Sequence, residues 1–243
     1  MRDPNFAELA RYQTLEGLEI PAIARAMAGG TDPQLAWRNE LGGLTFRIGS
    51  RYLKWNPRST GIDLERERLR LEWISTRHPA PRVVDHGQDD GAQWLLTEAV
   101  PGGSAVGDEW RVRRPEAIRA IAAGLRAIHA TPIDGFPGEW TAQVWVGRQP
   151  SSLGPRPPID DPVLVHGDAC APNTLITKDG AWTGNVDFGD LAVGDRWADL
   201  AVASMSLDWN FGEGHKPEFF EAYGIVPDEE RIRYYRGLWH VES

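Results

Sequence analysis

Cysteine is almost absent from the 243 residues, and Cys170 is the only one. A disulfide needs two thiols and a cysteine-rich zinc site needs several, so both are excluded, and this usage is typical of a reducing compartment. No apolar run reaches the roughly 18 residues of a membrane span, and the first residues, MRDPNFAELARYQ, lack the apolar core of a signal peptide. We therefore expect a cytoplasmic protein with no membrane partner.

Lysine is also scarce. The 26 basic residues comprise 23 arginines and only three lysines, Lys54, Lys178 and Lys216. Where arginine is the default surface cation, a lysine inside an apolar segment indicates a specific role. Lys54 is such a residue, because it lies in the strand-like stretch RYLKW.

Positive charge is in deficit, with 35 acidic residues against 26 basic ones and a formal net charge of -9. The deficit is uneven, because residues 1–98 carry 13 basic and 14 acidic side chains whereas residues 99–243 carry 13 and 21. Such a field repels nucleic acid and favours a cationic partner. The length suffices for two lobes with a core. We expect a monomer or a weak homodimer that binds no nucleic acid.

Glycine and proline residues mark the turns that divide the first hundred residues into short strands and helices. A helix is expected before Gly29, two or three strands over residues 35–55, a helix over 62–78, and two strands around a turn at 88–91. The pattern then changes, with a helix over 114–130, a proline-rich loop at 150–162, a strand at 163–166, a hairpin, and a largely helical remainder from Trp197 onward.

These patterns predict an α+β protein with two lobes. The N-terminal lobe, residues 1–98, is a small antiparallel sheet with a helix. Residues 99–103 form a short hinge, and residues 104–243 form a larger, mainly helical and acidic lobe.

The segment HGDACAPN places Asp168 and Asn173 five residues apart in a loop that leaves an apolar strand. The hairpin that follows turns near Asp179, so antiparallel pairing sets Asn173 opposite roughly Val186 and brings Asp187 beside it. Two carboxylates and an amide oxygen form a hard-oxygen site suited to Mg²⁺, with one carboxylate left as a base. Each residue taken alone is typical of a loop cap or turn.

The order of these residues matches the catalytic loop and Asp-Phe-Gly motif of kinases. The phrase LVHGDACAPNTLI, followed by VDFGD and DRWADLA, resembles the aminoglycoside phosphotransferase family, and the 3′-phosphotransferases (kanamycin and neomycin kinases) in particular. The resemblance runs from about Trp37 to Trp239 and is most specific over 164–201. It implies a protein-kinase-like fold, ATP or GTP as phosphoryl donor, Mg²⁺, and an aminoglycoside acceptor whose O-phosphorylation gives antibiotic resistance.

The resemblance also implies roles for individual residues. Asp168 resembles the catalytic base, and Asn173 and Asp187 resemble the metal ligands. Lys54 matches the lysine that grips the α- and β-phosphates, and Glu67 matches its ion-pair partner. A loose phosphoryl-transfer transition state is stabilised mainly by positioning of the reactants and by neutralisation of charge, and these groups supply both.

The remaining nucleotide contacts are implied by position. Gly42 and Gly43, in NELGGLTF, stand where the nucleotide-covering loop would be, and their amides would approach phosphate. Glu98 and Val100 would offer backbone groups to the purine edge, while Ala99 would pack on the ring. His166 is expected to position the catalytic loop, Cys170 to be a buried apolar residue, and Asp199 to bond the backbone of that loop.

The acceptor side departs from the family pattern. Related kinases carry a longer helical insertion before the catalytic loop, whereas only about 35 residues separate His129 from His166. The segment 137–162 would have to rebuild the substrate wall, with Asp160 and Asp161 as replacement acids.

The C-terminus departs as well. Related kinases end in an acidic Leu-Asp-Glu segment, where this chain has LWHVES. Glu242 is the acid left to bind an amine there, and Trp209 is a candidate to line a sugar site.

Three alternatives remain open from the sequence. The first is a kinase of the same fold with another cationic hydroxylated acceptor, such as a peptide antibiotic, a macrolide or an amino alcohol. The second is a nucleotide-binding pseudokinase or a partner-binding module, either of them without activity. The third is a metal-dependent hydrolase built on His166 and Asp168, although no other histidine lies at ligand spacing.

Overall fold

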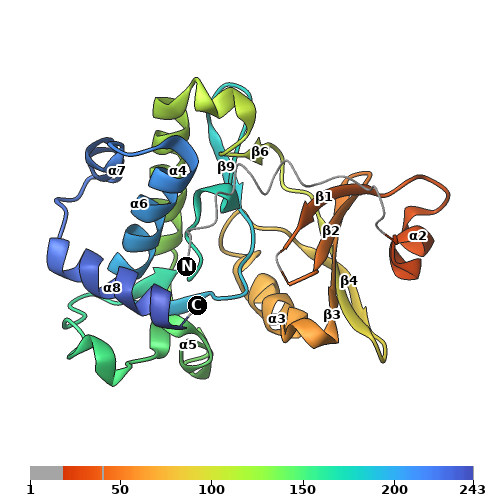
Figure 1. Cartoon of the computed structure of the whole chain (residues 1–243), viewed down its shortest axis with the longest axis horizontal. Helices are drawn as coiled ribbons and strands as arrows, with labels where there is room; N and C mark the ends of the chain where they lie inside the picture. Colours follow the sequence, from red (N-terminus) through yellow and green to blue (C-terminus); the bar gives the residue numbers. More distant parts are fainter. Residues whose placement is uncertain (1–18, 40, 243) are drawn as a thin grey trace. The chain divides into compact units, whose positions relative to one another are not determined.

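A computed structural model of the chain describes residues 19–39 and 41–242. The chain divides into two compact units, which are followed along the sequence in Figure 1. The first unit takes the residues up to Ser75 together with Pro81–Ala99, and the second takes Thr76–Ala80 and the residues from Val100 onward. Each unit has its own secondary structure and is described separately.

The first unit is a five-stranded antiparallel sheet in the order β1-β2-β3-β5-β4, with two helices. The strands expected over 35–55 and around the turn at 88–91 are confirmed. The elements are α2 (Ala22–Ala28), β1 (Gln34–Arg38), β2 (Leu44–Ile48), β3 (Arg51–Pro57), the 3₁₀ turn η2 (Arg58–Thr60), α3 (Leu64–Ile74), β4 (Val83–Gln88) and β5 (Ala92–Glu98).

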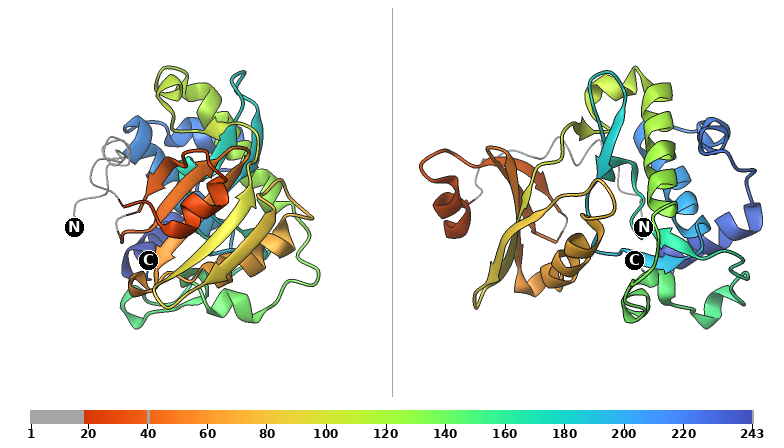
Figure 2. Two further views of the ribbon diagram at one scale, coloured as in Figure 1. Left: turned by 90° about the vertical axis from the view of Figure 1, so that its right-hand side faces the viewer. Right: turned by 180° about the vertical axis from the view of Figure 1, so that it is seen from behind.

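Helices α2 and α3 lie on opposite faces of this sheet (Figures 1 and 2). Ala24 of α2 packs with Phe46 and Leu53 of the sheet, all fully buried, and each large apolar side chain buried in this way contributes about 1.5–3 kcal/mol. Helix α3 begins after Asp63, whose side chain accepts hydrogen bonds from two amides of the first turn. It ends at Ile74, earlier than the expected 62–78.

The second unit is mainly helical, with two small antiparallel sheets, β10-β7 and β6-β8-β9. The expected helix over 114–130 and the hairpin that follows residues 166–173 are confirmed, and the proline-rich loop contains the 3₁₀ turn η5. The elements are β6 (Gly103–Ser104), η3 (Asp108–Arg111), α4 (Arg114–His129), α5 (Glu139–Ala142), η4 (Trp145–Gly147), η5 (Ser151–Leu153), β7 (Val163–Val165), η6 (Ala171–Asn173), β8 (Thr174–Ile176), β9 (Trp182–Asn185), β10 (Ala192–Gly194), α6 (Trp197–Phe211), α7 (Lys216–Tyr223) and α8 (Glu229–Glu242).

Helix α6 forms the centre of the second unit, between α4 and α8 (Figure 1). It is apolar on nearly all sides, and most of its side chains are buried. Two buried polar side chains interrupt this apolar helix near its middle, Ser204 and Ser206, and Asp199 is fully buried in its first turn. Because buried polar groups require hydrogen-bond partners, these residues mark where α6 supports other parts of the unit.

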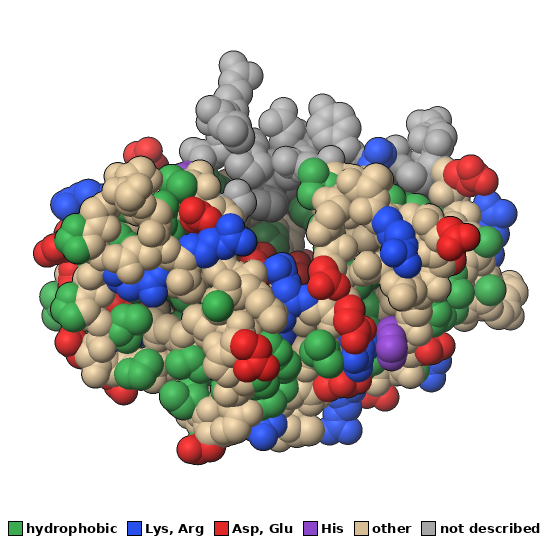
Figure 3. Space-filling view, turned by 90° about the horizontal axis from the view of Figure 1, so that it is seen from below, with side chains coloured by type: hydrophobic (Ala, Val, Ile, Leu, Met, Phe, Trp, Pro, Cys, Tyr) green, Lys and Arg blue, Asp and Glu red, His purple; other side chains and the backbone are tan. Residues whose placement is uncertain are grey.

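One face of the molecule carries both signs of charge. Acidic and basic side chains are interspersed on the face shown in Figure 3, with apolar side chains scattered between them. Within residues 19–39 and 41–242, every helix is too short or too polar to cross a lipid bilayer.

Candidate active site

Asp168 lies in a loop that leaves the buried strand β7 after Val165. The loop turns at Gly167, whose φ is +81°, and a Cβ atom at that position would lie 1.9 Å from the carbonyl oxygen of Asp190. Only glycine tolerates this conformation and this close approach. The turn therefore brings Asp168 directly out of the core.

The backbone of this loop is held by Asp199 of α6, as the sequence predicted. The amides of His166 and Gly167 donate to its two carboxylate oxygens at 2.7 and 3.0 Å. The carboxylate also accepts from Nε2 of His129 at 3.0 Å, and Nδ1 of that ring lies 2.7 Å from the hydroxyl of Tyr223. A buried chain of hydrogen bonds thus anchors the loop to α4, α6 and α7.

His166 joins the loop to the strand on the other side of the site. Its Nδ1 accepts from the amide of Asp168 at 3.2 Å, and its Nε2 donates to the carbonyl of Val186 at 2.9 Å. The ring therefore carries its proton on Nε2. This places His166 as a support for the loop, in agreement with the sequence prediction.

The carboxylate of Asp168 is only partly satisfied. Nδ2 of Asn173 donates to Oδ2 and to the backbone carbonyl of Asp168, both at 3.0 Å. Oδ1 is buried and has no hydrogen-bond partner among residues 19–39 and 41–242. Burial, and then the nearby carboxylate of Asp187, raise the pKa of Asp168. The Cys170 thiol stays protonated, because burial and Asp168 raise its pKa well above the ordinary value.

Asp187 reaches the site from the hairpin, in the register predicted from the sequence. Thr174 pairs with Asn185, and the amide of Val186 donates to the carbonyl of Asn173 at 3.0 Å. Asp187 itself has a φ of 68°, the one positive value at a non-glycine residue of the described chain. Backbone strain of this kind clusters at functional sites, and it directs this side chain away from the path of a regular strand.

The three side chains offer oxygen donors of the kind that a magnesium ion prefers. They supply two carboxylates and, because the amide nitrogen of Asn173 faces Asp168, one amide oxygen. No cluster of three or more histidine, cysteine or acidic side chains that would hold a metal occurs in the described residues. The unpartnered Oδ1 of Asp168 and its repulsion from Asp187 are the two features that a divalent cation would relieve.

In the first unit, Lys54 of β3 and Glu67 of α3 form the predicted ion pair. Nζ of Lys54 lies 2.7 and 2.8 Å from the two carboxylate oxygens. Glu67 is buried, whereas Glu65 faces outward and pairs with Arg68 of the same helix. The helix phase read from the sequence is thus confirmed, and the role of the pair in nucleotide binding stays a prediction.

The two glycines expected to cover the nucleotide lie in the turn between β1 and β2. Their amides are used within the turn, since Gly43 donates to the side chain of Asn39 at 2.6 Å and Gly42 donates to its carbonyl at 3.2 Å. A Cβ atom at Gly43 would overlap the side chain of Asn56. To bind phosphate, these two amides would therefore have to break their hydrogen bonds to Asn39 and donate to phosphate oxygens instead.

The connector residues end the first unit and begin the second. The amide of Glu98 donates to the carbonyl of Arg82, and that of Ala99 donates to the carbonyl of Ser50, both at 2.9 Å. Val100 is the first residue of the second unit beyond this point. Their contacts with a purine stay predictions.

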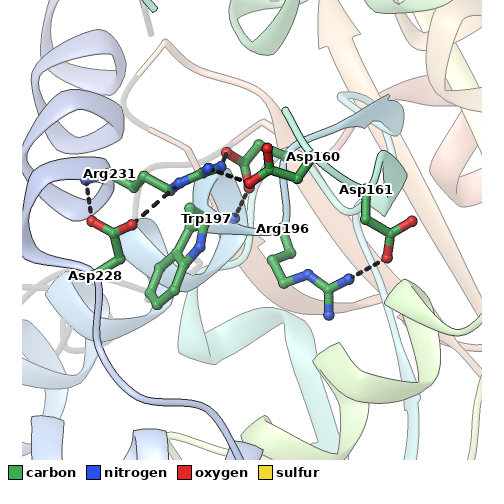
Figure 4. Close-up of a pocket in the computed structure, with 7 residues that line it drawn as sticks. Asp160, Asp161, Arg196, Trp197, Asp228 and Arg231 are labelled. Atoms are coloured by element: carbon green, nitrogen blue, oxygen red, sulfur yellow. Dashed lines mark hydrogen bonds and ion pairs between the residues drawn. The ribbon is translucent and has the colours of Figure 1, made fainter. Parts of the chain in front are cut away.

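Two of the four acceptor candidates line a pocket of about 220 Å³ in the second unit (Figure 4). Asp160 pairs with Arg231 at 2.7 Å, and Asp161 pairs with Arg196 at 2.8 Å. Arg231 also binds the buried carboxylate of Asp195 at 2.6 Å. An acceptor amine would have to compete with an arginine for either acid.

The other two candidates lie elsewhere in the second unit. Glu242 pairs with Arg148 at 3.0 Å, and Trp209 is half-buried near the end of α6. Their contact with an acceptor stays a prediction, as does that of Asp160 and Asp161.

Two residues that support the loop around Asp168 were not singled out from the sequence. The hydroxyl of Ser206 accepts from the amide of Ala171 at 2.9 Å, and Nε1 of Trp145 donates to the carbonyl of Gly167 at 2.5 Å. A serine inside an apolar helix is a signal that could have identified Ser206. Nothing in the sequence distinguishes Trp145 from the other ten tryptophans.

A lysine on β3 paired with a glutamate on α3, and two aspartates and an asparagine around a loop anchored to α6, are typical of kinase-like phosphotransferases. The sequence profile of the phosphotransferase enzyme family matches residues 43–153 and 150–235. The chain belongs to this family.

Individual relatives agree with that assignment. An aminoglycoside 3′-phosphotransferase of Streptomyces fradiae is 34% identical, covering 89% of this chain and 90% of its own. The crystal structure of an aminoglycoside-3′-phosphotransferase of type VIII is 28% identical, with a TM-score of 0.70 over 88% of this chain and 96% of its own. An aminoglycoside phosphotransferase of Streptomyces rimosus, solved in complex with ADP and streptomycin, is 25% identical, with a TM-score of 0.65 over 92% of this chain and 97% of its own.

Proposed function

We propose that this protein is a small-molecule kinase that transfers the γ-phosphoryl group of ATP, or of GTP, to a hydroxyl group of an aminoglycoside antibiotic. The observation that carries the proposal is the buried, unpartnered Oδ1 of Asp168 beside Asn173 and Asp187, in a chain of the phosphotransferase family. The names of its relatives support an aminoglycoside as the acceptor.

Asp168 acts as the base of the proposed reaction. Its ionised carboxylate orients the acceptor hydroxyl through Oδ1 and accepts the hydroxyl proton as the phosphoryl group is transferred. Asn173 holds Oδ2 during this step, and the hydrogen bonds of His166 and Asp199 keep the backbone in place. A fixed base is what a loose transition state requires, because positioning supplies much of the acceleration.

Asn173 and Asp187 are the residues that would hold Mg²⁺ together with the phosphates. When bound, the ion supplies positive charge that neutralises the phosphate oxygens and lowers the repulsion between the two carboxylates. Asp187 reaches its position through an unusual backbone conformation. This supports a role that an ordinary loop aspartate does not need.

Lys54, oriented by Glu67, binds the α- and β-phosphates in this proposal. The ammonium group is a compact donor with three hydrogens, and two of its contacts go to the Glu67 carboxylate. Gly42 and Gly43 cover the phosphates, while the backbone groups of residues 98–100 contact the purine. These contacts extend the proposal to the whole nucleotide.

The acceptor is a polycation that the acidic second part of the chain attracts. Asp160, Asp161 and Glu242 are the proposed carboxylate contacts, and Trp209 is the proposed aromatic wall. Since each of the three acids pairs with an arginine, an aminoglycoside amine would replace a guanidinium group as it binds.

The pairing of these three acids with arginines also favours a second candidate. This is a kinase that acts on another cationic hydroxylated molecule, such as a peptide antibiotic, a macrolide or an amino alcohol. The departures at 137–162 and at the C-terminus fall where the acceptor is chosen. If the acids at these two places are arranged differently from those of related kinases, they would fit an acceptor whose amines are spaced differently.

A panel of acceptors with coupled detection of ADP separates these candidates. Turnover with kanamycin, neomycin or streptomycin supports the first proposal, and turnover only with non-aminoglycosides supports the second. Asp168→Ala should abolish turnover with every acceptor, whereas Asp134→Ala, at an exposed aspartate, should not change it. Equal turnover by wild type and Asp168→Ala would contradict both candidates.

A further inference from the structure

The peptide bond between Gly167 and Asp168 is held at both of its polar atoms. Nε1 of Trp145 donates to the Gly167 carbonyl at 2.5 Å, and the amide of Asp168 donates to Nδ1 of His166 at 3.2 Å. The preceding amide, that of Gly167, donates to Asp199. Rotation of the backbone before Asp168 would break at least one of these bonds, so they fix the direction of its Cα–Cβ bond, from which the carboxylate extends.

Trp145 is suited to this contact because its own ring is held in place. Trp145 is 3% exposed, and it is the first residue of the 3₁₀ turn η4, directly after Val144. The preceding helix α5 is tied to β10, since the amide of Val193 donates to the hydroxyl of Thr141 at 3.0 Å. An indole N–H is a donor only, and a backbone carbonyl is the partner it matches.

Trp239 of α8 packs against the same ring. The two indole rings meet edge to face, with centroids 5.3 Å apart and an angle of 90° between their planes. Edge-to-face contact is the favoured geometry of aromatic pairs. Trp239 stands in the last turns of α8, so the C-terminal helix reaches the catalytic loop through Trp145.

We propose that Trp145 is a positioning residue for Asp168, and that Trp239 acts on the loop through Trp145. This inference rests on the proposed function, because it concerns the base of the proposed reaction. The short segment 137–162 then has a second role besides contact with the acceptor. It supplies the indole N–H of Trp145, which positions Asp168.

Trp145→Phe tests the hydrogen bond, because it keeps an aromatic ring and removes the N–H. A misplacement of about 1 Å costs roughly 100-fold in rate, so a loosened loop should lower kcat about ten-fold. The KM values for nucleotide and acceptor should change less than about two-fold, since the substrate contacts remain. Trp110→Phe is the matched control, because Trp110 is equally buried and makes no hydrogen bond to residues 166–173 in the described chain. It should lower the melting temperature to a similar extent and leave kcat unchanged.

Trp239→Leu tests the second step without removing the N–H. It should lower kcat about three-fold, and the double variant with Trp145→Phe should be no slower than Trp145→Phe alone, because Trp239 acts only through Trp145. Additive losses, or an unchanged kcat in Trp239→Leu, would overturn this step. An unchanged kcat in Trp145→Phe, or a loss that Trp110→Phe reproduces, would overturn the inference as a whole.

Hydrogen exchange provides a readout that does not need activity. In wild type the indole N–H of Trp145 should exchange slowly, and in Trp145→Phe the amides of residues 166–168 should exchange at least about ten-fold faster than in Trp110→Phe. Equal exchange in the two variants would contradict the inference even if the wild type phosphorylated no acceptor. Absence of wild-type turnover would contradict only the proposed function.

Discussion

The carboxylates of Asp168 and Asp187 lie close enough to repel each other, and burial together with this repulsion raises the pKa of Asp168. An acid whose pKa is raised by folding binds its proton more tightly in the folded state. The free energy of unfolding therefore falls as the pH rises from the unfolded pKa through the folded one. At neutral pH the ionised carboxylate of Asp168 therefore lowers the stability of the folded chain.

Replacing Asp168, the proposed base, separates activity from stability. Asp168→Asn should lower kcat by about 10²- to 10⁴-fold, the range of general-base contributions. It should also raise the melting temperature at pH 7, because the uncharged amide removes both the burial of a charge and the repulsion from Asp187. A coupled assay measures kcat, and scanning calorimetry measures the melting temperature. A lowered melting temperature would contradict the claim that the ionised Asp168 carboxylate destabilises the fold.

The proposed metal ligands should be detectable through the magnesium requirement. Asp187→Asn keeps a residue that tolerates a positive φ but removes a charge, so the Mg²⁺ concentration for half-maximal turnover should rise about ten-fold or more. Thermal shift with ATP, with and without Mg²⁺, provides a second measurement, since a ligand that binds the folded state raises its stability. A matched control is Asp179→Asn in the exposed hairpin turn, which should leave the requirement as it is.

The ion pair of the first unit should control nucleotide affinity. Glu67→Gln removes the charge that orients Lys54, and the KM for ATP should rise about ten-fold while the KM for the acceptor stays the same. Glu65→Gln on the same helix is the control, because Glu65 pairs outward with Arg68 and should have no kinetic effect. Equal nucleotide KM values in the two variants would show that the pair is structural only.

Stability should fall in mild acid through His78. Burial lowers its pKa to about 4, although its Nε2 bonds Oδ1 of Asn185. Because the unfolded chain binds this proton near pH 6.5 and the folded one only near pH 4, stability rises with pH across that window, by about 3 kcal/mol in all. In His78→Gln the urea midpoint should depend less on pH between 4 and 6.5. The same pH dependence in His78→Gln and wild type would show that burial does not prevent the folded protein from protonating His78 over this range.

The sequence predicted the backbone geometry around Asp168 because that geometry is local. The turn position of one hairpin determines the pairing of Thr174 with Asn185, and that register brings Asp187 to Asn173. The phase of a single helix likewise separates Glu67 from Glu65. Spacing alone carries this information, since strand and helix periodicities are known in advance.

The acceptor side could not be predicted in the same way. The partners of Asp160, Asp161 and Glu242 are arginines that lie 71, 35 and 94 residues away in the sequence. The contact of Trp145 with Gly167 spans 22 residues and depends on how an irregular segment packs. No periodic pattern specifies such pairs, because tertiary packing brings them together.

The most direct test of the account follows the phosphoryl group itself. Wild type and Asp168→Ala would be incubated with ATP labelled in its γ-phosphate, Mg²⁺ and the aminoglycoside panel, and the products would be analysed by mass spectrometry. The account predicts labelled phosphate on a hydroxyl of at least one aminoglycoside with wild type and none with Asp168→Ala. Unmodified aminoglycosides with the wild-type protein, or equal labelling by the two proteins, would contradict it.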